Sequence, residues 1–169
     1  MKKILIIFFI INFNNLSFGS IKENIISNLQ NIDNLSFDFE QNIKGKIEKG
    51  NCIIKYPKKI FCKYDSANNK TLVSNGKSLV IKTNSGSYYR YSLERTPLNY
   101  ILDKNFLIDE IQNLEEKENE INVFFDNETF DLVGWQIKDI YQNINVTYLS
   151  SIKKNQQIDK DLFKLPSQN

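Results

Sequence analysis

The residues best placed for covalent chemistry are the only two cysteines of the sequence, Cys52 and Cys62. They lie in the stretch GNCIIKYPKKIFCKYD (Gly50–Asp65), which has the pattern of two short strands folded about Tyr56-Pro57-Lys58. Because side chains alternate along a strand, this loop places the two thiols opposite each other on one face of a hairpin. The chemistry available to such a pair is disulfide formation, with two small buried free thiols as the alternative.

Little else in the sequence supports catalysis or metal binding. The chain has no histidine, which removes the commonest general base and metal ligand. It also has no glycine-rich phosphate loop and no G-x-S-x-G sequence. The carboxylate pairs Asp109-Glu110 and Glu115-Glu116 lie in polar stretches typical of a solvated surface. We therefore expect no enzyme activity, no cofactor and no metal site.

The N-terminal residues have the pattern of a signal peptide over residues 1–19. Two lysines precede the apolar run Ile4–Phe13, and a small-x-small cleavage site ends at Gly19. Cleavage there leaves one domain, residues 20–169, which we expect to be exported. The mature chain then begins with Ser20 and not with cysteine, so we expect no lipid anchor.

Charge and compartment narrow the function further. Without the two lysines of the signal peptide, 20 basic residues face 20 acidic ones. This balance is unlike the basic excess of nucleic-acid-binding proteins, so we expect no nucleic-acid partner. Export also places both cysteines in an oxidising compartment, which favours a Cys52–Cys62 disulfide.

Hydrophobic periodicity predicts one N-terminal helix, about nine to eleven short antiparallel strands and one short inserted helix. The first helix covers Ser20–Ile32, and Thr96-Pro97 begins the inserted one, which ends near Leu102. Phe106–Leu114 fits either a helix or a strand. The expected strands are Ser36–Ile43, Gly45–Tyr56, Lys59–Asp65, Lys70–Ser74, Lys77–Lys82, Tyr88–Leu93, Ile121–Phe125, Val133–Ile140 and Ile144–Leu149.

Asn75-Gly76 predicts a two-residue type I′ hairpin. This turn would place Leu72 opposite Leu79, with Ile81 on the same face. A meander of such strands must bury one face, and a single strongly curved sheet wrapped over helices does this economically. The 12 Phe and 8 Tyr residues fit either an ordinary core or the wall of a cavity for a hydrocarbon ligand.

Several short motifs occur in an order that resembles one protein family. Together they make the chain similar to the LolA-type outer-membrane lipoprotein carriers over about Ser20–Pro166. The motifs are Phe39-Glu40-Gln41, Gly50 followed by Ile54–Phe61 and Tyr64, Leu72–Leu79, Thr96-Pro97-Leu98 with Ile101-Leu102, and Phe163 with Pro166.

The resemblance implies a mainly β fold with α-helices, an unclosed half-barrel covered by the N-terminal helix and a short helical lid. It implies a monomeric periplasmic carrier that holds the acyl chains of triacylated lipoproteins in a hydrophobic cavity. An inner-membrane ABC transporter would supply them, and an outer-membrane receptor would accept them. The alternatives are a lipid-sensing regulatory domain, or another lipid-binding domain, of the same fold. The anchored receptor of similar fold needs a cysteine at the mature start, where this chain has Ser20.

The resemblance also implies site residues. Tyr56 stands where well-known members have an arginine that bonds the lid, so the lid is expected to close more weakly or through another contact. Cys62 and Val80 replace aromatic residues common in the family. The expected cavity lining is Phe37, Phe39, Ile54, Ile60, Tyr64, Leu72, Leu79, Ile81, Tyr89, Tyr91, Leu98, Ile101 and Leu102.

Overall fold

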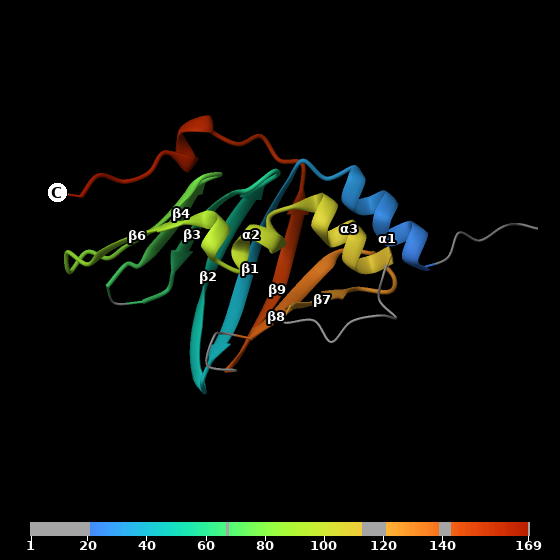
Figure 1. The fold of residues 1–169 in the computed structure, drawn as a ribbon, viewed down its shortest axis with the longest axis horizontal. Coiled ribbons are helices and arrows are strands. Elements are labelled where there is room, and N and C mark those ends of the chain that lie inside the picture. The colour runs from blue at the N-terminus through green and yellow to red at the C-terminus, as the bar shows by residue number, and fades with distance from the viewer. Residues whose placement is uncertain (1–20, 67, 113–120, 139–142, 169) are drawn as a thin grey trace, which may run out of the picture.

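The computed structural model describes residues 21–66, 68–112, 121–138 and 143–168, so the expected signal peptide lies outside the described residues. These residues form one antiparallel sheet of nine strands with three α-helices lying across one of its faces (Figure 1). The helices are α1 (Ile21–Gln30), α2 (Leu98–Ile101) and α3 (Lys104–Gln112). The strands are β1 (Asn34–Ile43), β2 (Lys46–Lys55), β3 (Lys59–Tyr64), β4 (Thr71–Asn75), β5 (Ser78–Lys82), β6 (Tyr88–Ser92), β7 (Ile121–Phe125), β8 (Leu132–Lys138) and β9 (Ile144–Lys154).

The order of the strands places the first strand, β1, beside the last strand, β9. Along the sheet the order is β6-β5-β4-β3-β2-β1-β9-β8-β7, so β1 pairs with both β2 and β9. The described strands leave β6 and β7 at opposite edges, and the sheet is therefore not closed. The mainly β, unclosed half-barrel with an N-terminal helix is confirmed.

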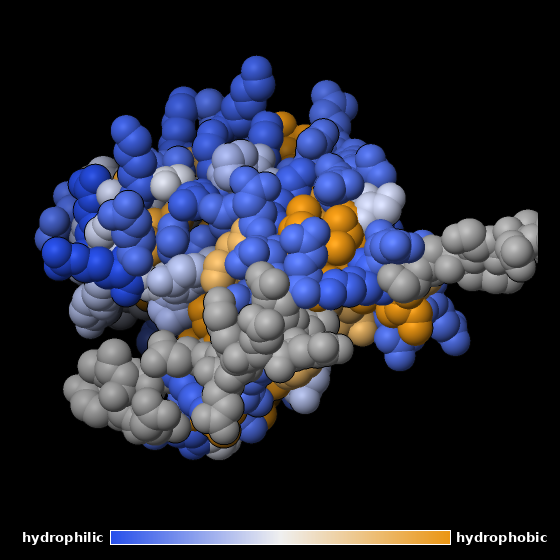
Figure 2. Space-filling model, turned by 45° about the vertical axis from the view of Figure 1, so that its right-hand side comes forward, coloured by the Kyte–Doolittle hydropathy of each residue, from blue (hydrophilic) through white to orange (hydrophobic). Residues whose placement is uncertain are grey.

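The helices bury their apolar stripes against one another and against the sheet. Helix α1 buries Ile25 and Leu29, and α3, which contacts α1, buries Leu107 and Ile111. Figure 2 shows a mostly hydrophilic surface on this side, which hydrophobic side chains reach only in small patches. Most of the apolar surface of these helices is thus removed from water, which is the main favourable contribution to folding.

The structure resolves the ambiguous segment Phe106–Leu114. Its residues up to Gln112 belong to helix α3, because Leu107 and Ile111, four residues apart, share one helical face. The Lys104 ammonium fixes the start of this helix by donating to the Ile32 carbonyl oxygen at 2.9 Å. The insertion between the strands therefore holds two helices, α2 and α3, where the sequence predicted only one.

The β2–β3 hairpin has the predicted register. Cys52 lies opposite Cys62 and Ile54 opposite Ile60. The two cysteines form a disulfide across the strands, with their Cα atoms 4.1 Å apart. The parity argument and the expected disulfide are both confirmed.

The β4–β5 hairpin differs from the predicted one by two residues. Leu72 pairs with Ile81, and Ser74 pairs with Leu79. The side chain of Asn75 accepts from the backbone N–H groups of Lys77 and Ser78, both at 3.0 Å, and widens the loop. The predicted two-residue turn was wrong, yet a shift of two residues keeps every side chain on its expected face.

The C-terminal strand is longer than predicted. The strand expected over Ile144–Leu149 continues to Lys154, because an irregularity opposite Ser36 and Asp38 absorbs Ser151, which has a φ of 54°. The following 3₁₀ helix, Lys160–Phe163, buries Phe163 and contacts β3 and β4. Figure 1 shows this segment on the side of the sheet away from α3.

Candidate functional site

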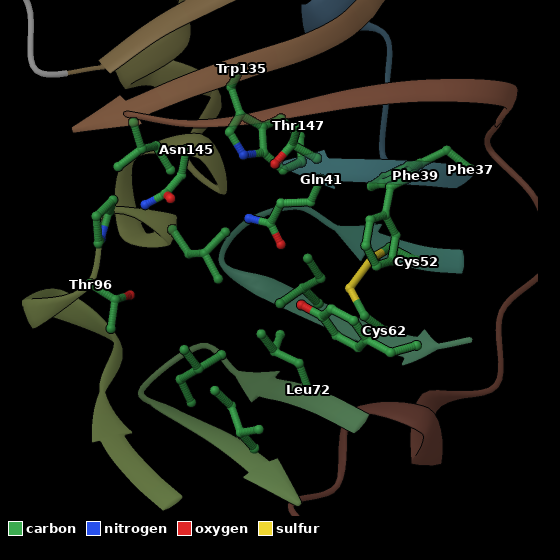
Figure 3. A pocket seen from close by; sticks show the side chains of 17 residues that line it. Phe37, Phe39, Gln41, Cys52, Cys62, Leu72, Thr96, Trp135, Asn145 and Thr147 are labelled. Carbon is green, nitrogen blue, oxygen red and sulfur yellow. A yellow bond between two sulfur atoms is a disulfide. The ribbon is translucent and has the colours of Figure 1, made fainter. Parts of the chain in front are cut away.

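A cavity of about 320 Å³ lies between the sheet and the segment that begins α2 (Figure 3). Side chains from seven strands and from the start of α2 form its wall. The described residues that line it are Phe37, Phe39, Gln41, Cys52, Ile60, Cys62, Tyr64, Leu72, Leu79, Ile81, Thr96, Pro97, Leu98, Trp135, Ile137, Asn145 and Thr147. None of these residues carries a charge.

One end of the cavity is apolar. Leu72 of β4 and Leu79 and Ile81 of β5 line it, and Leu98 at the start of α2 also lines the cavity. The Cys52–Cys62 disulfide forms the adjoining wall. This end can exclude water and bind hydrocarbon.

The opposite end of the cavity is polar. Gln41 of β1 and Thr147 of β9 are direct neighbours across the two strands, and Asn145 lies two residues before Thr147 on the same face. Asn145 Oδ1 and Thr147 Oγ1 are both buried and have no hydrogen-bond partner among the described residues. An unpaired buried polar group costs about 1–3 kcal/mol, so these two atoms need an explanation.

Aromatic residues form the rest of the wall around this polar end. The rings of Phe37 and Trp135 meet edge to face with their centroids 6.4 Å apart. Trp135 is the cross-strand neighbour of Thr147. These contacts fix the indole against the threonine, since aromatic pairs favour this geometry.

Tyr64 forms part of the wall next to the disulfide and separates the cavity from a charged pair. Its ring meets Phe39 edge to face at 5.0 Å, and the Lys70 ammonium lies 3.7 Å from the ring centroid. Burial, with a smaller contribution from the Glu48 carboxylate, raises the pKa of Tyr64 to about 12. Burial acts against ionisation of Glu48, but Lys70 and Lys46 outweigh it and lower the pKa of that carboxyl.

Ten of the thirteen residues expected to line the cavity are placed beside it or at its edge, and three lie in the core. Phe37, Phe39, Ile60, Tyr64, Leu72, Leu79, Ile81 and Leu98 line the cavity. Tyr89 and Tyr91 pair with Ile81 and Leu79 on the same face, but they lie on the edge strand β6, about half exposed. Ile54, Ile101 and Leu102 are fully buried in the core behind the wall.

Tyr56 lies under the helical insertion, buried against the core. Its hydroxyl has no hydrogen-bond partner among the described residues, and burial raises its pKa. The Lys104 ammonium of α3 lies 5.7 Å from the centroid of its ring, while the hydrogen bond and the ion pair that join this turn to the insertion come from Lys58. Its backbone N–H donates to the Leu102 carbonyl at 2.8 Å, and its ammonium lies 3.5 Å from the Asp103 carboxylate.

The polar end of the cavity was not predicted from the sequence. Gln41 continues the alternation of Phe37 and Phe39, and Asn145 and Thr147 continue that of Leu149, so the parity signal was present. Polar residues in strands usually face water, and this general tendency hid their true position.

Two further findings limit the chemistry. Within the described ranges, no group of three or more His, Cys, Asp or Glu side chains is placed to hold a metal ion. None of the helices in the described part of the chain has both the length and the apolar character of a membrane span.

An open antiparallel half-barrel with an uncharged, largely apolar cavity under helices defines a binding protein for apolar groups. The family model of the "Outer membrane lipoprotein carrier protein LolA" matches residues 30–166, and the chain belongs to this family. The family is described as one of carriers and not of enzymes.

Two solved structures are distantly similar to this chain. A LolA superfamily protein from Nitrosomonas europaea is 10% identical with a TM-score of 0.44, over 86% of this chain and 96% of that one. A DUF1329 family protein from Desulfovibrio piger is 10% identical with a TM-score of 0.42, over 85% and 95%. A comparison with curated proteins found no match.

Proposed function

We propose that this protein is a periplasmic carrier that binds the acyl chains of triacylated lipoproteins in its cavity. It receives them from an inner-membrane ABC transporter and delivers them to an outer-membrane receptor. It acts as a single domain, residues 20–169, and as a monomer after removal of residues 1–19. The observation that carries the proposal is the cavity, whose described lining has no charge and whose apolar end lies between β4, β5 and α2.

The energetics fit this role. Each CH₂ group removed from water contributes about 0.8 kcal/mol, so an acyl chain needs a shielding protein to cross an aqueous space. The cavity of about 320 Å³ lies at the low end of the roughly 300–1,000 Å³ typical of sites for one small ligand. Three acyl chains exceed it. The proposal therefore requires that α2 and α3 move away from the sheet during loading.

The test is to purify the mature protein from its native envelope and to identify the bound molecule by intact mass spectrometry. We expect a triacylated lipoprotein. Free fatty acid, or an empty cavity in protein taken from cells with an active transporter, would contradict the proposal. Transfer to an acceptor membrane separates a carrier from a lipid-sensing domain, because a sensor retains its ligand.

A matched pair of variants on α2 connects that result to the cavity. Leu98→Glu places a carboxylate in the apolar end, where an unpaired charge is strongly disfavoured, and should abolish co-purification of the lipoprotein. Tyr100→Glu places the same charge two residues away, at a side chain that is 43% exposed and outside the cavity lining. Tyr100→Glu should retain the lipoprotein.

A further inference from the structure

The polar end of the cavity has the features of a second binding element. Thr147 is only 3% exposed, yet its Oγ1 has no hydrogen-bond partner among the described residues, and the same holds for Asn145 Oδ1. Figure 3 shows both side chains and that of Gln41 around the same space, across the cavity from Leu72. Buried polar atoms are normally paired, so these groups fit a ligand that supplies the partners.

The chemistry of the three side chains specifies the group that they would bind. All three are neutral, and each can donate or accept a hydrogen bond. Since none of the described lining residues carries a charge, a carboxylate or a phosphate in this position would be buried without a counter-ion, which is strongly unfavourable. An amide matches both unpaired atoms, because its N–H can donate to Asn145 Oδ1 while its carbonyl accepts from the Thr147 hydroxyl.

The spacing supports a single amphiphilic ligand. Gln41 and Thr147 pair across β1 and β9, while Leu72, Leu79 and Ile81 lie on β4 and β5 at the far end of the same cavity. A ligand whose polar group lies at the first end can extend its hydrocarbon chain to the second.

From the unpaired Asn145 and Thr147 atoms in an uncharged cavity, we propose that the site recognises an acyl chain joined through a neutral amide, as at an N-acylated amino terminus. Asn145 and Thr147 form the hydrogen bonds with the amide, and Gln41 lies beside them as a further neutral polar group. This inference rests on the proposed acyl-chain function and adds to it a reason for selecting acylated termini over free fatty acids.

The test measures competition with N-phenyl-1-naphthylamine, an apolar fluorescent probe without a carbonyl group. At pH 8 we expect dodecanamide to displace it at least tenfold more effectively than dodecanoate, whose identical chain ends in a charge. Methyl dodecanoate, which offers a carbonyl but no hydrogen-bond donor, should lie between them. Equal displacement by the amide and the carboxylate would overturn the inference, and equal displacement by the amide and the ester would overturn the assignment of Asn145 to the amide N–H.

Two variants connect this selectivity to the named atoms. Thr147→Val and Asn145→Leu keep similar shapes and should each weaken dodecanamide binding about fivefold, the effect of one net hydrogen bond. Their affinity for the apolar probe should not fall, because both substitutions make the cavity wall more apolar. The melting temperature of the empty variants should equal or exceed that of the wild type, since an unpaired buried group has been removed. Unchanged amide affinity in both folded variants would overturn the inference.

The proposed carrier function and this inference fail in different ways. If no acyl compound displaces the probe from the wild-type protein, acyl-chain binding itself fails. If dodecanamide and dodecanoate displace it equally, acyl-chain binding stands and only amide recognition fails. A synthetic triacylated lipopeptide and its analogue lacking the N-acyl chain complete the comparison, with the full lipopeptide expected to bind more tightly.

Discussion

The backbone N–H of Lys58 donates a hydrogen bond of 2.8 Å to the carbonyl oxygen of Leu102, and so connects the β2–β3 turn to the end of α2. The Lys58 ammonium adds an ion pair with Asp103 at 3.5 Å, between side chains about one third exposed. These contacts are made two residues after Tyr56, where the family resemblance led us to expect either a weaker closure of the lid or closure through another contact. Lys58, the residue after Pro57, thus connects the turn to the helical insertion and holds the insertion closed.

Removing the ion pair should loosen the insertion slightly. Asp103→Asn keeps the bond that the Asp103 side chain accepts from the Asn105 backbone and removes only the charge. Exposed pairs contribute about 0–1 kcal/mol, so we expect amide hydrogen exchange at Ile101 and Leu102 to accelerate up to about fivefold. Asp161→Asn, which breaks an exposed pair with Lys164, is the control. Equal acceleration in both variants would contradict a latch.

The Tyr56 hydroxyl should contribute little to closure. Because it is buried and has no partner among the described residues, Tyr56→Phe should leave the free energy of unfolding unchanged or raise it by about 1 kcal/mol. Urea denaturation measures this change, and hydrogen exchange at Leu102 measures closure. Faster exchange in Tyr56→Phe would instead support the latch role that the sequence predicted for this residue.

The alternation of side chains along a strand predicted the part of the site that the β2–β3 hairpin forms. The positions of Cys52 and Cys62 followed from strand parity and loop length alone, because both act over a few residues. The β4–β5 register needed one more fact, namely that the Asn75 side chain bonds the backbone ahead of it. A prediction from turn residue types alone does not include such hydrogen bonds between a side chain and the nearby backbone.

The other half of the site depends on contacts between distant parts of the chain. Gln41 meets Thr147 only because the last strand pairs with the first, and no local pattern predicts that pairing. Ile101 and Leu102 were expected in the cavity but lie in the core, because α3 packs beside α2. The sequence of Phe106–Leu114 fitted either a helix or a strand, so this packing could not be predicted. Side-chain periodicity therefore predicted on which face of the sheet a side chain lies, but it did not predict which distant segments lie beside one another.

The disulfide should stabilise the hairpin measurably. Cys52 and Cys62 are separated by ten residues, and a loop of this size corresponds to about 2–3 kcal/mol in the chain-entropy model. Reduction should lower the free energy of unfolding by that amount in urea denaturation. The double variant Cys52→Ala, Cys62→Ala is the control, since its stability should not respond to reductant. An equal midpoint for oxidised and reduced wild type would contradict a stabilising role.

Alkaline pH should destabilise the protein through Tyr64 and also through Tyr56, because burial raises the pKa of both phenols. The pKa of Tyr64 is raised from 10.0 to about 12 in the folded state, so folding favours the protonated phenol. This stabilisation is complete below pH 10 and is lost as the pH rises from 10 to about 12. Tyr64→Phe should therefore reduce the loss of unfolding free energy between pH 9 and pH 12. An equal slope in wild type and Tyr64→Phe would contradict this assignment.

Gly50 permits two aromatic rings of the cavity wall to meet. It pairs with Phe39 on one side and with Tyr64 on the other, and those rings lie 5.0 Å apart across it. A Cβ atom at Gly50 would lie 2.1 Å from the Lys63 carbonyl oxygen and 2.9 Å from Phe39 Cε1. The backbone oxygen cannot move away without disturbing the strand, so alanine must displace both the strand and the ring.

Gly50→Ala should therefore lower the free energy of unfolding by about 2–3 kcal/mol, as overpacking does in other cores. Because Phe39 and Tyr64 line the cavity, it should also weaken binding of N-phenyl-1-naphthylamine to the folded variant. Asn51→Ala is the control, because this exposed neighbour points to the opposite face and should change stability by no more than about 0.5 kcal/mol. If Gly50→Ala were as stable as Asn51→Ala, the wall would adapt more freely than this packing allows, and the aromatic pair would not depend on the glycine.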